Sequence, residues 1–219
     1  MASRPIDEAE SGSAGALVAM CVAEAGSGAH RWFAADAGHG PRDIADAIHF
    51  LCVLQGRHPG VIELAALRAT EPAARAWLSD AAEAMADERR YLAKLAVAAG
   101  GAPSTPNSSQ SEGAVAGQRA ALATLAQSDR HGCAIGAALA FALDWRAVRI
   151  VLDAAANRLG VDAPPFGLGQ PDEVRLVADV IGEAALAERA LLFGASQLVR
   201  QHWGLWDLLE ARKAARANA

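Results

Sequence analysis

The sequence has few cysteines, and their pattern argues against two kinds of cysteine-dependent site. Its three cysteines, Cys21, Cys52 and Cys133, are odd in number, widely spaced and set among apolar residues. That pattern argues against a disulfide framework and against a zinc site. Acidic residues precede the first apolar stretch, where a secretory signal would need positive charge. We therefore expect a soluble, cytoplasmic protein.

Long apolar runs and basic clusters are also missing. The longest uninterrupted apolar stretches, residues 14–23 and 132–143, are shorter than the roughly 20 residues that a transmembrane helix needs. The net charge is −5 at pH 7, and the basic residues are scattered along the chain. No run of them could follow a phosphate backbone. We expect neither a membrane nor a nucleic acid as partner.

What the sequence does contain favours helices. Alanine is abundant, β-branched residues are sparse, and aromatic residues make up only 5% of the chain. Apolar residues recur at intervals of three and four, and no segment alternates with a period of two. Short connections join the periodic segments. The sequence therefore predicts an all-α fold, a single-domain antiparallel bundle of about five to seven helices.

The bundle is expected over residues 14–213, between a flexible N-terminal tail at 1–13 and a C-terminal tail at 214–219. The predicted helices cover 14–25, 41–55, 59–70, 72–99, 115–159 and 172–212. Residues 102–113 are polar and contain two prolines, so we expect a mobile loop there. The sequence leaves open whether 115–159 is one helix or two, with Asp129 as the cap of the second.

Small residues mark one expected helix contact. Gly132, Gly136 and Ala140 are spaced one turn apart, and together they form a ridge that lets a neighbouring helix approach closely.

Polar residues on otherwise apolar helix faces are the candidate site residues. They are Asp46, His49, Glu88, Asp129 and Glu188. Helical bundles such as the di-iron carboxylate proteins hold metal ions with inward-facing carboxylates and histidines. We expect His49 and Glu88 to meet, because a short segment separates their helices and short connections favour neighbouring antiparallel helices.

A structural reading competes with the metal site. A lone acid in a helix seam usually pairs with arginine from a neighbouring helix, and Arg89, Arg146 and Arg149 are available partners. Trp203 and Trp206 lie one turn apart and suggest a homodimer contact, since large aromatic residues are enriched at interfaces.

Three segments carry a resemblance to a family. They are residues 47–66 (AIHFLCVLQGRHPGVIELAA), 103–106 (PSTP) and 125–146 (LAQSDRHGCAIGAALAFALDWR). Together they resemble a family of uncharacterised bacterial helical proteins, over residues 41 to 160. The resemblance implies an all-helical fold and brings no site residues. The similarity to ferritin-like and haem-oxygenase-like bundles concerns architecture alone.

Two functional hypotheses follow from the sequence. The first is a helical binding or interaction protein without catalytic chemistry, with a small molecule in the bundle core or a second copy of the chain as partner. The alternative is a metal-binding bundle enzyme that uses the inward-facing Asp, Glu and His residues.

Overall fold

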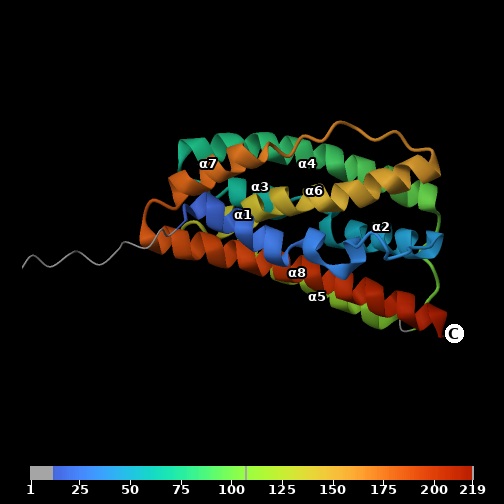
Figure 1. Cartoon of the computed structure of the whole chain (residues 1–219). Helices are drawn as coiled ribbons and strands as arrows, with labels where there is room; N and C mark the ends of the chain where they lie inside the picture. Colours follow the sequence, from blue (N-terminus) through green and yellow to red (C-terminus); the bar gives the residue numbers. More distant parts are fainter. Residues whose placement is uncertain (1–11, 107, 219) are drawn as a thin grey trace, which may run out of the picture.

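The computed structural model describes residues 12–106 and 108–218, and every regular element in these ranges is helical (Figure 1). The elements are α1 (Ala14–Ala25), the short 3₁₀ helices η1 (Ser27–Ala29) and η2 (Arg31–Phe33), α2 (Pro41–Gln55), α3 (Val61–Ala66), α4 (Pro72–Ala99), α5 (Ser108–Ala126), α6 (Cys133–Leu159), α7 (Pro171–Ile181) and α8 (Ala185–Ala217). The predicted all-α class is confirmed.

Helix starts follow local chemistry that the sequence displays. Pro41, Pro72 and Pro171 each occupy the first position of a helix, where the missing N–H is not needed. Asp43 Oδ2 accepts a hydrogen bond from the backbone N–H of Gly40 at 2.9 Å, which satisfies a donor at the start of α2. The predicted starts at Pro41 and Pro72 are therefore correct.

Four expectations about helix boundaries need correction. Helix α8 continues to Ala217, so residues 214–217 of the expected C-terminal tail are helical. Helix α5 begins at Ser108, so residues 108–113 of the expected loop are helical. The segment 115–159 is divided between two helices, and Gly132, with a left-handed φ of 89°, precedes α6 in place of Asp129. The expected helix 172–212 is also divided, because α7 ends before Gly182. A Cβ atom at Gly182 would overlap that of Ala14. This last break makes eight α-helices within the described ranges.

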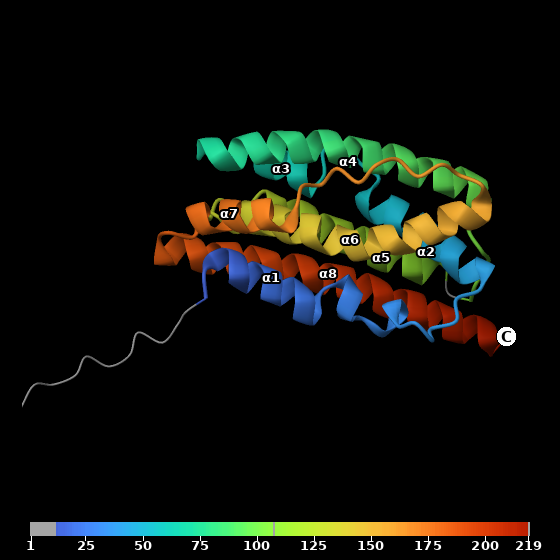
Figure 2. The same cartoon turned by 45° about the horizontal axis from the view of Figure 1, so that its top comes forward.

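Helix α6 is the central element of the bundle. It contacts α8 most extensively and also packs against α1, α3, α4, α5 and α7. Figure 2 shows α6 between α4 on one side and α1 and α8 on the other. Successive long helices run antiparallel. Helices α6 and α8 run parallel, because the extended segment 160–170 and then α7 return the chain to the end where α6 began (Figure 1). Alanine and other small side chains on α6 allow several neighbours to surround it.

Two glycines set the distance between α6 and α8. A Cβ at Gly136 would overlap the carbonyl oxygen of Leu191, and one at Gly194 would overlap the carbonyl oxygen of Cys133. The backbones of the two helices therefore touch directly. The close approach predicted for the ridge that contains Gly132 and Gly136 is confirmed.

Among the described residues, no helix combines the length and apolar character that a membrane crossing requires.

Candidate functional site

Glu88 lies in the packed interface between α4 and α6, where it has two partners. Its carboxylate forms an ion pair with Arg149 and accepts a hydrogen bond from Trp145 Nε1 at 2.9 Å. Burial raises the pKa of Glu88, although the hydrogen bond from Trp145 and the charge of Arg149 oppose this effect. This ion pair matches the structural interpretation, in which an acid in a helix seam pairs with an arginine from a neighbouring helix.

The other donors of Arg149 are satisfied in the same interface. Its Nε donates to Asp153 at 2.6 Å, and Nη2 donates to the carbonyl of Pro164. Burial lowers the pKa of Arg149, but the hydrogen bond to Asp153 and the charge of Glu88 raise it further, so the net shift is upward. The side chains of Glu88, Trp145 and Arg149 thus all have protein partners.

Asp46 is enclosed by arginines from the C-terminal end of α8. Arg212 binds it with two hydrogen bonds of 2.9 and 3.0 Å, and Arg216 binds it as well. Arg216 also pairs with Asp43 at 2.5 Å. Asp46 therefore holds α8 against α2.

His49 and Glu88 do not meet, so that expectation is wrong. His49 Nε2 lies 2.8 Å from the carbonyl oxygen of Gly100, just beyond the end of α4. Glu88 lies 12 residues earlier on α4, roughly 18 Å along its axis, and faces α6. The helices are antiparallel neighbours as expected, but their register and the rotation of α4 separate the two side chains.

Asp129 and Glu188 lie apart from these clusters. Asp129, 96% exposed, pairs with Arg68 at 2.6 Å. Glu188 lies in the first turn of α8. Within residues 12–106 and 108–218, no three His, Cys, Asp or Glu side chains are grouped so that they could hold a metal ion. The structure thus brings none of the five candidates together.

Two cavities border α2 and α5. One has a volume of about 670 Å³ and lies between α2, residues 102–104, α5 and the end of α8. The other, of about 310 Å³, lies between the end of α2, the start of α3 and α5. Arg57 and Arg119 line both cavities. We call the two cavities with these shared arginines the arginine cleft.

Arg57 and Arg119 are free of protein partners in the described part of the chain. Neither forms an ion pair or a hydrogen bond with residues 12–106 or 108–218. One acid, Glu112, lines the larger cavity, along with His49 and Arg212. Because Asp46 already neutralises Arg212, the cleft keeps an excess of positive charge on a chain whose net charge is −5.

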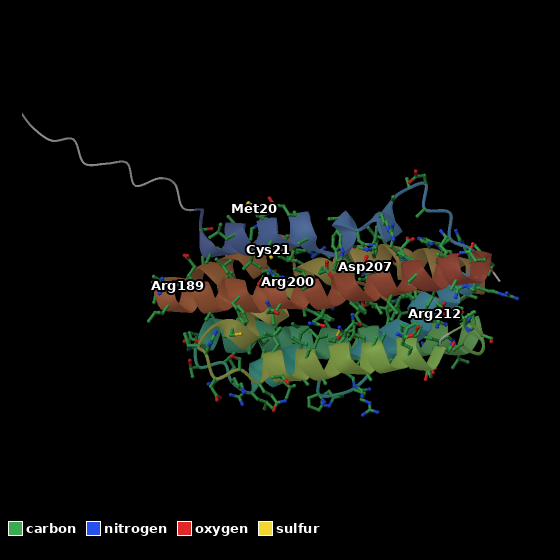
Figure 3. All side chains as sticks on the ribbon, turned by 90° about the horizontal axis from the view of Figure 1, so that it is seen from below. Met20, Cys21, Arg189, Arg200, Asp207 and Arg212 are labelled. Atoms are coloured by element: carbon green, nitrogen blue, oxygen red, sulfur yellow. The ribbon has the colours of Figure 1, made fainter. Side chains whose placement is uncertain are left out.

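The remaining walls of the cleft are largely apolar. Phe50 and Val53 border the larger cavity, and Leu54, Val61 and Leu64 border the smaller one. Figure 3 shows Arg212 near the C-terminal end of α8, where this helix borders α2 and α5. An apolar hollow with a few polar groups is the usual form of a small-molecule site.

Cys52 is the thiol in the wall of the larger cavity, and its reactivity is suppressed. Burial raises the pKa of its thiol to about 11, and its Sγ lies 3.7 Å from the carbonyl oxygen of Leu92. A thiol with this pKa is protonated at neutral pH, and the thiolate is the reactive form. Covalent chemistry through Cys52 is therefore disfavoured.

The sequence reading missed both arginines for different reasons. Arg57 follows Gly56 in a turn and looks like any exposed basic residue. Arg119 carries a signal that was available: it lies four residues after Val115 and three before Leu122, both of them buried. A charged residue at that spacing belongs beside the apolar face of α5.

The comparisons with known proteins identify a family but no activity. A family model described as a family of unknown function, DUF6975, matches residues 22–217. No curated protein and no solved structure matches the chain significantly.

Proposed function

The chain belongs to the family of unknown function DUF6975, and we propose that it is a helical binding protein that takes a small organic anion into the arginine cleft. The observation that carries this proposal is the pair Arg57 and Arg119, which line the same two cavities without a carboxylate partner in the described residues.

The contrast with other arginines supports the proposal. Arg89 forms two hydrogen bonds with Glu63 at 2.7 and 2.8 Å, and Arg149 and Arg212 have equally complete sets of acceptors. Arg57 and Arg119 border the same two cavities without such acceptors. A bound anion would supply the missing acceptor oxygens, which favours ligand binding over a structural role for these residues.

The guanidinium group fixes the class of ligand. Its planar fork of N–H donors matches the two oxygens of a carboxylate or a phosphate. The apolar walls around Phe50 and Leu54 would cover a hydrocarbon portion of the same molecule. The expected ligand is therefore an amphipathic anion, with its charged end at the two arginines.

A binding titration tests the function. We expect hexanoate or hexyl phosphate to bind and the neutral hexanamide to bind at least tenfold more weakly, since hydrogen bonds to charged groups contribute about 1.5–3 kcal/mol. Arg57→Gln and Arg119→Gln should each weaken anion binding by about tenfold or more. Arg158→Gln is the matched control, because Arg158 is exposed and does not line the cleft.

The result that would overturn the function is equally specific. If neither anion binds, or if the control variant weakens binding as much as the cleft variants do, the cleft is not the binding site.

We also propose, as separate points, a cytoplasmic bacterial protein and a homodimer. Three free cysteines support the first point. The homodimer would not use Trp206, which is fully buried within its own chain, but Leu186 and Phe193 of α8 are 75% and 45% exposed. Light scattering of the purified protein would give the subunit number directly.

A further inference from the structure

Glu112 and Arg119 are side chains of opposite charge that line the larger cavity of the arginine cleft. They are seven residues apart on α5, so they lie on one face of this helix, separated by roughly 10.5 Å along its axis. Arg119 also lines the smaller cavity, as Arg57 does, whereas Glu112 lines the larger cavity alone. The acidic and the basic groups of the larger cavity are therefore separated along its length.

The larger cavity runs along α2 and α5. His49 on α2 and Ser108 at the start of α5 both line it. The smaller cavity is lined by residues that come later on both helices, such as Leu54 on α2 and Ala123 on α5. The order of these residues places Glu112 toward the His49 end of the cleft and the two shared arginines toward its middle.

Glu112 has no partner in the described part of the chain. It forms no ion pair or hydrogen bond with residues 12–106 or 108–218. Arg212, which lines the same cavity, is already paired with Asp46. The carboxylate of Glu112 is therefore available to a cation from outside the protein, just as the two shared arginines are available to an anion.

We propose that the ligand of the arginine cleft is a zwitterion, with an ammonium group at the end of the molecule opposite its anionic group. This proposal rests on the function proposed above. The anionic group binds Arg57 and Arg119, and the ammonium group lies beside Glu112. The hydrocarbon chain that joins them lies against Phe50 and Val53, which occupy α2 between His49 and Arg57. An ω-amino carboxylate has this form.

Matched pairs of ligands test the proposal. The probes are ω-amino carboxylates of four to eight carbons, each compared with the alkanoate in which a methyl group replaces the ammonium group. Calorimetric titration gives the ratio of the two dissociation constants in the wild-type protein and in Glu112→Gln. At the chain length that reaches Glu112, the substitution should shift this ratio about twofold to fivefold against the amino carboxylate, the usual value of one exposed ion pair.

The variant Glu83→Gln is the matched control. Glu83 is exposed, as Glu112 is, and it does not line the cleft. Its substitution removes the same charge from the chain, so the ratio of dissociation constants should stay at the wild-type value. An equal shift in both variants would show a general effect of net charge and would overturn the proposal.

The outcomes separate this proposal from the proposed function. If the carboxylates bind but the ratio is the same in wild type and Glu112→Gln at every chain length, the ammonium site is wrong and the anion site stands. If neither the alkanoates nor the amino carboxylates bind, both are wrong.

Discussion

The α4–α6 interface and the arginine cleft both contain arginines beside apolar side chains. They differ in whether the protein supplies hydrogen-bond acceptors for the guanidinium groups. In the interface, Arg149 has Glu88, Asp153 and a backbone carbonyl as acceptors. In the cleft, Arg57 and Arg119 have no protein acceptor among the described residues. The same residue type is thus structural where its partners are built into the fold, and open to a ligand where they are not.

The largest expected effect comes from breaking the ion pair between Glu88 and Arg149 in the α4–α6 interface. Glu88→Ala should destabilise the protein by roughly 3–5 kcal/mol, because Arg149 loses its buried carboxylate and keeps only the half-exposed Asp153, and Trp145 Nε1 loses its acceptor. Urea unfolding measures the loss. The double variant Glu88→Leu with Arg149→Met should lose less than Glu88→Ala alone, since it leaves no stranded charge. A single-variant loss below about 1 kcal/mol would contradict the role of the pair.

The second-largest expected effect concerns the close packing between α6 and α8. Gly136→Ala should cost about 1–3 kcal/mol or more, because the added methyl group overlaps the backbone of α8 at Leu191. Gly117→Ala is the matched control. Gly117 lies within α5 with no atom near its Cβ position, so alanine should stabilise the helix by about 0.5–1 kcal/mol. Thermal unfolding of both variants gives the contrast, and equal effects would refute it.

The pH dependence of stability should reveal the contribution of a second ion pair, Glu63 with Arg89. Burial raises the pKa of Glu63, but the hydrogen bonds and charge of Arg89 outweigh burial, so the pKa is lowered. A carboxyl group with a lowered folded-state pKa contributes stability above its unfolded value, about 4.3, and loses it as the pH falls through the folded value. Wild type and Glu63→Gln should therefore differ most at pH 7 and converge as the pH falls through the lowered folded-state pKa of Glu63. A constant difference across this range would exclude the pair as the cause.

The smallest expected effect on stability comes from replacing the two arginines of the arginine cleft. Arg57→Gln and Arg119→Gln should change the free energy of unfolding by less than about 0.5 kcal/mol, because neither residue has a described partner to lose. Urea unfolding in the absence of any anion is the measurement. A loss of 2 kcal/mol or more would mean that these arginines are structural, and the comparison between the two regions would fail.

Several features of the fold follow from the sequence alone because their causes are local. A proline at the first position opens α2 and α4, and spacing of three and four marks the apolar face of each helix. The one-turn spacing of Gly132 and Gly136 predicts a close helix contact without identifying the neighbouring helix. The sequence also identified Glu88 as an unusual polar position and Arg149 as an available partner.

Only the tertiary structure decided which side chains meet. The register of α2 against α4 places His49 beside Gly100, and the rotation of α4 directs Glu88 toward α6. The arginine cleft depends on two residues 62 positions apart, Arg57 in a turn and Arg119 on α5, which no local pattern connects. Periodicity specifies the face that a helix buries, but register and direction are set by how all the helices pack at once.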